Sequence, residues 1–259
     1  MPVQTLCTVA ETIRLNAYAY SLTLDVGEEL SREVSCGQFV HIKCGHSRLL
    51  RRPISICDWK ENHLRVVFEV RGEGTEWLSR RKVGDTLDVL GPLGHGFDVG
   101  GKRLLLVGGG IGAPPLLACA KRAADRGAEV RAALGFRDAE HTMLTEEFGA
   151  VCTSVDLVSD DGTAGRRGLV TVPVEEILRA AEENASEIQV LACGPKTMLR
   201  GVAELAARYG APCQVSLEER MGCGVGACLV CACKTTDGHR RHVCKDGPVF
   251  NAGEVDWDD

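Results

Sequence analysis

A group of cysteines near the end of the chain has the residue type and spacing of a metal–sulfur site. Its members follow the pattern Cys-x4-Cys-x2-Cys-x12-Cys and are Cys223, Cys228, Cys231 and Cys244. The first three have the C-x4-C-x2-C spacing of plant-type [2Fe–2S] proteins, in which thiolates hold two irons. Gly222, Gly224 and Gly226 allow the unusual backbone angles of a loop that turns its N–H groups toward sulfur. The pattern therefore predicts that these four cysteines bind a [2Fe–2S] cluster.

Other assignments of the same segment remain open. Four cysteines can hold zinc, but zinc sites usually pair two C-x2-C units, and the chosen set of four contains one. Cys233 lies two residues beyond Cys231, so in an extended segment both thiols would point to one side and could exchange as ligands. His239 and His242 suggest a Rieske-type centre as another alternative, in which histidines replace two of the cysteine ligands. Because four well-spaced cysteines are present, we expect both histidines to be exposed loop residues.

A glycine-rich turn is the second candidate site. A hydrophobic run leads into Gly108, Gly110 and Gly112, and two prolines follow, which are tolerated in the first turn of a helix. Backbone amides at such a turn can meet the pyrophosphate of a dinucleotide. Gly108, Gly110 and Ala113 fit G-x-G-x-x-[GA], but the expected acidic residue is not well placed, since Glu129 would open the next strand. The turn is thus a dinucleotide candidate without the standard fingerprint, and a purely structural turn is the alternative.

Two further segments carry groups that suit a cofactor. One strand-like run ends in Cys193, Gly194 and Pro195, and α/β sheets gather ligands at the carboxyl ends of their strands. Cys193 could contact a nicotinamide, and the alternative is a small buried thiol. In the other segment, Arg52 can bind phosphate through its planar fork and Ser55 can hydrogen-bond a flavin edge. Arginines beside a strand are more often simply solvated.

Three stretches of the chain, which differ in their pattern of hydrophobic, glycine and cysteine residues, must position these groups. Residues 1–100 contain short β-type runs broken by glycine and charge, at 38–43, 53–56, 63–70 and 86–90, and predict a β-barrel. Residues 101–212 alternate strand-like runs (103–107, 130–134, 155–158, 188–192) with helical stretches (114–126, 174–183, 197–209). This alternation predicts a parallel sheet flanked by helices. Residues 213–259, rich in cysteine and glycine, are too few to build a core, so we expect a metal to hold them together.

Composition narrows the function classes. The chain has 259 residues, 44% hydrophobic and 25% charged, which is ordinary for a folded protein with more than one domain. A net charge of −6 without a long basic run argues against nucleic acid as a partner. The beginning lacks the features of a secretory signal and no apolar run approaches the length of a membrane span, so we expect a cytoplasmic protein. In that compartment the 13 cysteines indicate metal ligands or buried thiols, not disulfides.

Taken together, these motifs resemble the ferredoxin-reductase-type flavoproteins, and more closely the family of electron-transfer subunits of NAD-dependent (class 1B) dihydroorotate dehydrogenases. The resemblance covers essentially the whole chain. It rests on residues 50–55 (LRRPIS), 72–75 (GEGT), 91–97 (GPLGHGF), 108–115, 193–195 and 218–233. It implies a Greek-key, FAD-binding β-barrel at residues 1–100, an NAD-binding α/β domain at 101–212 and a small C-terminal [2Fe–2S] domain at 213–259.

The resemblance also assigns residues to FAD. Those expected to bind it are Arg52, Pro53, Ile54, Ser55, Val67, Phe68, Glu69, Gly74 and Thr75. Family members often have an arginine where Glu69 stands, and Arg71 is the candidate to compensate. The glycine turn and the segment from Cys193 to Pro195 are the candidates for the nicotinamide dinucleotide.

The function that the resemblance implies is that of a redox adapter. Dihydroorotate is oxidised on FMN in a catalytic partner subunit, and electrons pass through the cluster and FAD of this chain to NAD⁺, in de novo pyrimidine (UMP) biosynthesis. The implied complex is a heterotetramer with two copies of each chain. This role requires no general acid, base or nucleophile in this chain, and none is nominated.

Two other functions compete with this one. A ferredoxin:NAD(P) oxidoreductase, an electron-bifurcating subunit or a hydrogenase-linked flavoprotein subunit has the same module order, and Arg137, Arg166 and Arg167 keep NADP open as the nucleotide. A non-catalytic iron–sulfur or zinc binding module is the alternative from a different class. A purified protein with both flavin and cluster absorbance would exclude that module.

Overall fold

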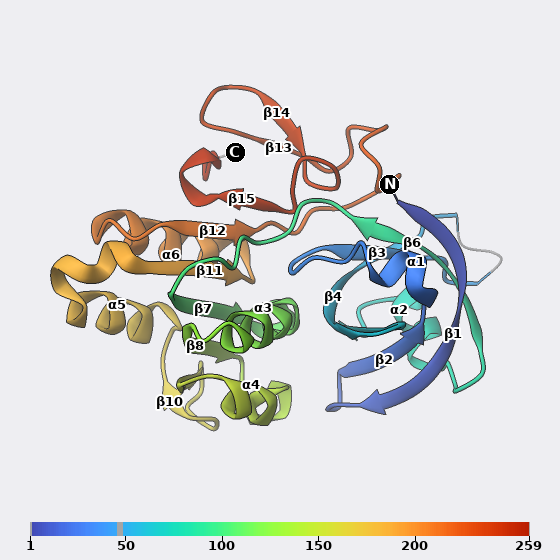
Figure 1. The fold of residues 1–259 in the computed structure, drawn as a ribbon, viewed down its shortest axis with the longest axis horizontal. Helices are drawn as coiled ribbons and strands as arrows, with labels where there is room; N and C mark the ends of the chain where they lie inside the picture. The colour runs from blue at the N-terminus through green and yellow to red at the C-terminus, as the bar shows by residue number, and fades with distance from the viewer. Residues whose placement is uncertain (1, 46–48, 259) are drawn as a thin grey trace.

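The computed structural model describes residues 2–45 and 49–258. It contains a closed barrel, a seven-stranded sheet covered by helices, and a C-terminal segment that lies above both (Figure 1). The barrel is built from the N-terminal part of the chain and the sheet mainly from the middle part. This is the β plus α/β architecture that the sequence predicts.

The barrel has six antiparallel strands in the closed order β1-β2-β5-β4-β3-β6. Their bounds are β1 Val3–Arg14, β2 Ala19–Asp25, β3 Phe39–Ile42, β4 Arg52–Lys60, β5 His63–Glu69 and β6 Thr86–Leu93. Alternate residues of β3 face opposite ways, as in any strand. Val40 and Ile42 belong to the apolar core of the barrel, whereas Phe39 joins the core shared with the sheet and the C-terminal segment. The outer side of β3 is therefore covered by another part of the chain.

Four of the six barrel strands coincide with the predicted runs, and β1 and β2 were not among them. Apolar residues of β1 occur on both of its faces, since Leu6 and Ile13 are exposed whereas Cys7 and Val9 are buried, so its alternating pattern is weak. Two short helices, α1 (Gly27–Ser31) and α2 (Glu73–Ser79), interrupt the strands. The Thr75 hydroxyl accepts the N–H groups of Arg71 and Gly72 at 2.9 and 3.2 Å and thereby fixes the start of α2.

The second sheet has the order β10-β9-β8-β7-β11-β12-β15. Its strands are β7 Arg103–Gly109, β8 Glu129–Phe136, β9 Ser154–Ser159, β10 Arg166–Arg167, β11 Ile188–Cys193, β12 Cys213–Ser216 and β15 Val249–Asn251. All neighbouring pairs are parallel except β12 with β15, so the sheet is parallel with one antiparallel edge strand. The four strand-like runs predicted between residues 101 and 212 are confirmed as β7, β8, β9 and β11.

Helices cover both faces of this sheet. They are α3 Pro114–Asp125, α4 Thr145–Val151, α5 Thr171–Ala180 and α6 Lys196–Arg208. Leu104 and Leu106 of β7 pack with α3 and α4, and Leu105 and Val107 pack with α5 and α6. The three predicted helices are present, and α4 is an additional short one. Four short 3-10 helices complete the described elements: η1 Gly110–Gly112, η2 Ala139–His141, η3 Glu182–Glu187 and η4 Ala252–Glu254.

The C-terminal segment shares the core of the sheet. Strands β12 and β15, on either side of the cysteine loop, belong to the sheet, and a separate hairpin is formed by β13 (Ala232–Lys234) and β14 (Arg240–His242). Val243 and Phe250 pack in one cluster with the apolar residues of α6. Residues 213–259 are too few to build an apolar core of their own, and they pack their apolar side chains against the neighbouring sheet domain. The predicted boundary at residue 212 falls immediately before β12.

The acidic tail has structural partners. Asp256 pairs with Lys234 at 2.8 Å, and Asp258 pairs with Arg200 of α6 at 2.9 Å. The Trp257 indole N–H donates to the carbonyl of Ala252 at 3.1 Å. The tail thus ties the β13–β14 hairpin to the sheet. No helix among residues 2–45 and 49–258 is both long and apolar enough to cross a membrane.

Helix α3 joins the two large bodies because it packs on β4 of the barrel. The Arg122 guanidinium lies 4.4 Å from the centre of the Trp59 ring, and Lys121 pairs with Asp58 at 2.6 Å. Arg65 of β5 donates to both carboxylate oxygens of Glu147 in α4, at 2.9 and 2.7 Å. These contacts fix the orientation of the barrel against the sheet.

Replacing Glu147 by glutamine should lower the thermal stability of the chain. The Arg65 side chain is only 18% exposed, so its charge would lose a partner in a place where water replaces it poorly. We expect a loss of about 1 kcal/mol, which is about 2–4 °C in melting temperature for a chain of this size. Glu28→Gln is the matched control, because the Glu28–Arg32 pair is exposed. Equal melting temperatures for the two variants would contradict the prediction.

Candidate functional site: a cavity beside a cysteine loop

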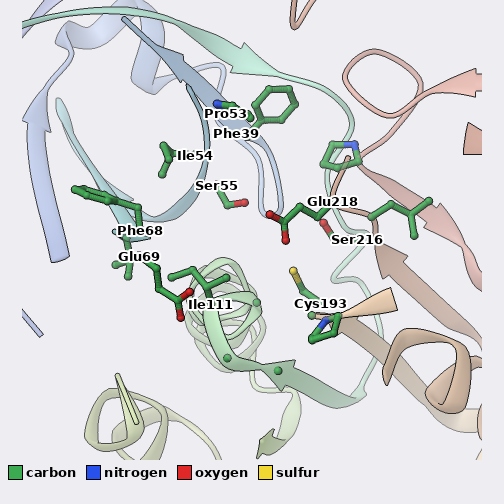
Figure 2. Close-up of a pocket in the computed structure, with 18 of the residues that line it drawn as sticks. Phe39, Pro53, Ile54, Ser55, Phe68, Glu69, Ile111, Cys193, Ser216 and Glu218 are labelled. Carbon is green, nitrogen blue, oxygen red and sulfur yellow. The ribbon is translucent and has the colours of Figure 1, made fainter. Parts of the chain in front are cut away.

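A cavity of about 400 Å³ lies where the barrel, the sheet and the C-terminal segment meet (Figure 2). Most of the residues proposed from the sequence line it, although they come from distant parts of the chain. They are Pro53, Ile54, Ser55, Val67, Phe68, Glu69, Thr75, Gly110, Gly112, Cys193, Gly194 and Pro195. The structure thus brings the expected FAD and NAD segments to one site.

Three of the proposed residues do not line the cavity. A Cβ on Gly74 would lie 2.4 Å from Nε of Arg52, so this arginine packs directly over the glycine. A Cβ on Gly108 would lie 2.9 Å from the Cα of Ala113. Gly108 therefore allows β7 to pack closely against the start of α3, and its role is structural packing in this geometry. Arg52 and Gly74 support the barrel side of the cavity.

The glycine turn lies at a switch point of the sheet. The chain runs from β7 to β8 and β9 on one side, whereas β11 pairs with the other side of β7. Gly108 is opposite Cys193 in this pairing, so both candidate nucleotide segments lie at the carboxyl ends of adjacent strands. Open α/β sheets bind ligands at such points. A Cβ on Gly112 would lie 2.3 Å from the Cys193 carbonyl oxygen, which explains why this position is glycine.

Ser55, Cys193 and Glu218 point toward one shared space in the cavity (Figure 2). Burial raises the pKa of the Cys193 thiol to about 12, although a hydrogen bond with Ser216 acts in the opposite direction. The thiol is therefore neutral at physiological pH and is not poised as a nucleophile. Glu218 is the one carboxylate of the three, and it comes from the start of the C-terminal segment.

A chain of charges crosses the mouth of the cavity. Arg71 lies 3.0 Å from the Glu69 carboxylate and 3.8 Å from that of Glu218. Arg71 lines the cavity, as does Glu69. The side chain of Arg71 is 61% exposed, so its pairing with either carboxylate is weak and can be exchanged for a ligand anion. Arg71 thus supplies positive charge beside Glu69 in the cavity.

The cysteine loop has the local geometry of a sulfur-binding site. The N–H groups of Val225 and Ala227 donate to Sγ of Cys223 at 3.4 and 3.3 Å, and Gly226 N–H donates to Sγ of Cys244 at 3.2 Å. Gly224 and Gly226 both have φ of +75°, a conformation in which side chains are strained. Gly224 and Gly226 therefore supply the unusual backbone angles predicted from the sequence, whereas the prediction is wrong for Gly222, whose φ lies outside the left-handed region.

Hydrogen bonding in the loop changes the acidity of its thiols. Burial opposes ionisation of Cys223, but N–H groups of Val225, Ala227 and Cys228 outweigh it and lower its pKa to about 6. Burial and the neighbouring Cys231 raise the pKa of Cys244 to about 12. Cys223 thus interacts with Cys228, and Cys244 interacts with Cys231 and Cys223, so the four proposed ligands lie close together. A thiolate at Cys223 suits metal binding, because the thiolate is the ligand form of cysteine.

Among the described residues, no group of three or more His, Cys, Asp or Glu side chains is arranged around a point that could hold a single metal ion. A [2Fe–2S] cluster divides four cysteines between two irons, so it does not require one such point. Cys233 lies in β13 and is buried in the shared core. His242, the last residue of β14, lies 3.5 Å from Asp246 in the turn that follows, and its backbone N–H also donates to that carboxylate at 2.7 Å. The choice of Cys231 over Cys233 as ligand stays a prediction.

Several cavity residues escaped the sequence analysis. They are Phe39, Ser216, Leu217, Glu219, Met221 and Pro248, together with Gly109, Ile111 and Glu218. Glu218 and Met221 fell inside a motif that was assigned to the cluster alone. Phe39 belongs to a strand that was predicted, but only the tertiary structure turns it outward to the cavity. No local signal marks such residues.

His41 is a further residue that sequence reasoning missed. It is fully buried in β3, and neither ring nitrogen has a hydrogen-bond partner among the described residues. Burial lowers its pKa to about 4; Arg51 and Arg52 act in the same direction, and the backbone of Cys223 opposes them. A buried polar group without a partner costs about 1–3 kcal/mol, so this one requires an explanation.

A closed antiparallel barrel, an α/β sheet with its cavity at the switch point, and a four-cysteine loop together define a ferredoxin-reductase-type electron-transfer protein with a C-terminal iron–sulfur segment. The family model for the iron–sulfur cluster binding domain of dihydroorotate dehydrogenase B matches residues 218–256. The chain is 44% identical over 260 residues to the dihydroorotate dehydrogenase B (NAD(+)) electron transfer subunit of Bacillus caldolyticus, covering 96% of each chain. It belongs to the family of these electron transfer subunits.

Other known proteins agree with this placement. The corresponding subunit of Caldanaerobacter subterraneus subsp. tengcongensis is 40% identical over 247 residues, covering 93% of this chain and 94% of the relative. The solved structure of an NADH-dependent reduced ferredoxin-NADP oxidoreductase, described in connection with flavin-based electron bifurcation, has a TM-score of 0.86 and 31% identity. That match covers 98% of this chain and 91% of the other. A ferredoxin reductase of carbazole 1,9a-dioxygenase, with a TM-score of 0.69 and 21% identity, shares the fold.

Replacing Gly112 by alanine should weaken binding of the nicotinamide dinucleotide. The new Cβ would lie 2.3 Å from the Cys193 carbonyl oxygen and 2.6 Å from Gly194 N, so the turn must move away from β11. We expect KM for NADH in dye reduction to rise about tenfold, which corresponds to about 1.4 kcal/mol. Gly149→Ala is the control, since nothing lies within 4 Å of its Cβ position. An unchanged KM in the Gly112 variant would show that the turn does not position the nucleotide.

Proposed function

We propose that this chain carries electrons between the FMN of a dihydroorotate-oxidising catalytic subunit and NAD⁺, through a [2Fe–2S] cluster and FAD. The observation that carries the proposal is the contact between the cysteine loop and the barrel strand that borders the cavity. Gly224 packs against His41 of β3, and Phe39 of the same strand lines the cavity. The cavity and the cysteine loop are therefore both in contact with the outer side of β3.

The relatives' names give the proposal its substrate. Proteins that are 40–44% identical over nearly their whole length are named electron transfer subunits of dihydroorotate dehydrogenase B (NAD(+)). We assign the same reaction to this chain, and with it a step in pyrimidine biosynthesis. A separate catalytic subunit follows from the role as an electron transfer subunit. Two copies of each chain in the complex, and a cytoplasmic location, remain predictions.

The cavity residues divide into two groups by position. We assign the flavin to the barrel side, where Pro53, Ile54 and Ser55 of β4 lie beside Phe68 of β5. When bound, a flavin exchanges two electrons with nicotinamide and single electrons with an iron–sulfur centre. The Ser55 hydroxyl points into the cavity and can hydrogen-bond a polar edge of the ring system, whereas the side chains of Ile54 and Phe68 belong to the barrel core behind it.

We assign the nicotinamide to the sheet side of the cavity. Gly110 and Gly112 leave backbone space at the end of β7, and Cys193 presents a neutral thiol at the end of β11. Glu218 faces the same space and can hold the carboxamide or exclude a second anion (Figure 2). None of these groups has to move a proton to carbon, because hydride transfer occurs between nicotinamide and flavin.

Phosphates of the cofactors need positive charge near the mouth of the cavity. Arg71 lines the cavity and Arg52 packs over Gly74 at its border. We propose that Arg71 takes the phosphate-binding role for which Glu69 is unsuited. A guanidinium presents a planar pair of donors to phosphate, which a carboxylate cannot do.

A second function has its own support. The oxidoreductase structure described for electron bifurcation covers 98% of this chain at 31% identity. A subunit that exchanges electrons between NADH and a ferredoxin-linked partner would use the same barrel, cavity and cysteine loop. The higher identity of the dihydroorotate dehydrogenase relatives favours the first proposal.

Purification of the chain together with a candidate FMN-containing dihydroorotate-oxidising subunit tests the proposal. The complex should show flavin and cluster absorbance and should reduce NAD⁺ with dihydroorotate only when both chains are present. Light scattering of the same sample gives the stoichiometry, with two of each chain expected. A stable flavin and cluster protein that ignores this subunit but oxidises NADH with a ferredoxin would establish the second function instead.

Cys228→Ser should separate the two halves of the electron path. Loss of one thiolate ligand disrupts cluster binding, because iron–sulfur clusters of this type need four cysteines. We expect dihydroorotate-dependent NAD⁺ reduction to fall at least a hundredfold, while NADH-to-dye activity at the flavin stays within about twofold. Cys233→Ser should retain the cluster and both activities. Equal loss of both activities in the Cys228 variant would mean that the loop is needed for folding, and cluster loss in the Cys233 variant would reverse the ligand assignment.

Apolar side chains on the cysteine loop are the expected contact with the catalytic subunit. Leu229 is 75% exposed, Val230 57% and Val225 44%, and they flank the proposed ligands. Grouped exposed apolar residues often mark interaction sites, and electron transfer requires the partner to approach the cluster closely. Leu229→Glu should weaken the complex at least tenfold in a binding titration and leave NADH-to-dye activity intact. Leu169→Glu, at a residue 65% exposed on the distant sheet domain, should bind normally. Equal affinities would place the docking surface elsewhere.

A further inference from the structure

The imidazole of His41 is held against the cysteine loop with its hydrogen-bonding capacity unused. Its exposed fraction is 0%, and among the described residues it is the buried side chain whose polar atoms have no partner. An imidazole always carries at least one N–H. Burying this N–H without an acceptor costs free energy, and an apolar side chain of similar size would fill the same space without that cost. A histidine at this position therefore indicates that an acceptor for the N–H is present.

The ring faces the loop at the first proposed ligand. The point where a Cβ on Gly224 would lie is 2.5 Å from Nδ1 of His41 and 2.9 Å from its Cε1. Gly224 therefore has to be glycine for the loop backbone to pass over the imidazole, and it directly follows Cys223. Burial lowers the pKa of the imidazole, and the backbone of Cys223 acts in the opposite direction.

His41 also contacts a residue that lines the cavity. The ring centre lies 6.3 Å from that of Phe39 in an edge-to-face arrangement, and Phe39 lines the cavity. The main chain at His41 is fixed on both sides, by pairing with Pro53 of β4 and with Leu90 of β6. Arg51 also donates to the His41 carbonyl at 3.3 Å. A rigid strand thus presents the imidazole to the loop.

We propose that His41 is a positioning residue for the [2Fe–2S] cluster: its ring donates an N–H hydrogen bond into the cluster loop at Cys223 and makes the reduction potential of the bound cluster more positive. Reduction adds negative charge to the cluster, and hydrogen bonds directed at its ligands and sulfurs stabilise that charge. The inference rests on the cluster binding of the proposed function. It assigns to His41, a barrel residue outside the cysteine motif, an influence on the difference in reduction potential that drives electron transfer between the cluster and the flavin.

Redox titration of the purified holoprotein, followed by electron paramagnetic resonance of the reduced cluster, tests the inference. His41→Phe removes every donor but keeps a planar ring, and His41→Asn keeps an amide N–H near the position of Nδ1. We expect a more negative cluster potential in the Phe variant and a potential closer to that of the unaltered protein in the Asn variant. Iron content and NADH-to-dye activity should not change in either. His242→Gln is the matched control in the hairpin and should leave the potential unaltered.

A second measurement does not depend on how well the Phe variant folds. In protein labelled with ¹⁵N-histidine, pulsed resonance of the reduced cluster should detect a weak nitrogen coupling that persists in His242→Gln and disappears in His41→Asn. Absence of any histidine coupling, or equal cluster potentials in the Phe variant and the unaltered protein, would overturn the role of His41. Absence of a cluster in the unaltered protein would instead overturn the proposed function.

Discussion

The antiparallel pairing of β12 with β15 is the constraint on which the site depends. Ser216 is opposite Val249 in this pair, and Leu217 N–H donates to the Pro248 carbonyl at 2.9 Å. The chain therefore leaves the sheet after β12 and returns to it at the same place in β15. The residues between Leu217 and Pro248 form a loop whose two ends are held together. That loop contains Glu218, which faces the cavity, and all four proposed cluster ligands. Two short strands thus fix the cysteine loop relative to the carboxyl ends of β7 and β11.

The barrel provides the opposite wall of the site. The two faces of β3 serve different purposes, since Val40 and Ile42 fill the barrel while Phe39 and His41 lie under the C-terminal segment. Helix α3 holds the barrel in this orientation through its packing on β4 and its pairs with Asp58 and Trp59. A small rotation of the barrel would move its side of the cavity away from both the glycine turn and the cysteine loop. Electron transfer over short distances requires such a fixed arrangement.

The charge pattern of the cavity also follows from three separate segments. Glu69 and Arg71 come from the end of β5, and Glu218 from the loop after β12. Each contact among them is weak because Arg71 is largely exposed. Exchangeable pairs of this kind keep a binding site hydrated and charged without locking it closed.

The sequence by itself determined the features whose chemistry is local. Cysteine spacing with interleaved glycines indicated the cluster loop, and alternating strand and helix patterns indicated β7, β8, β9 and β11 with three of their helices. The weak patterns of β1 and β2 hid those strands, because exposed apolar residues in β1 (Leu6, Ile13) and the buried Ser21 in β2 blur the alternation of polar and apolar residues. Gly108 matched a nucleotide motif, yet it packs against Ala113, since the same residue type serves close packing and phosphate approach equally well.

Only the tertiary structure decided which residues meet. Glu218 reaches the space shared by Ser55 and Cys193 because β12 lies beside β11, and no local pattern encodes that adjacency. His41 reads as an ordinary strand residue until the cysteine loop, about 180 positions later, is placed over its ring. Local sequence specifies backbone angles and burial periodicity, whereas contacts between distant segments arise from packing of the whole chain.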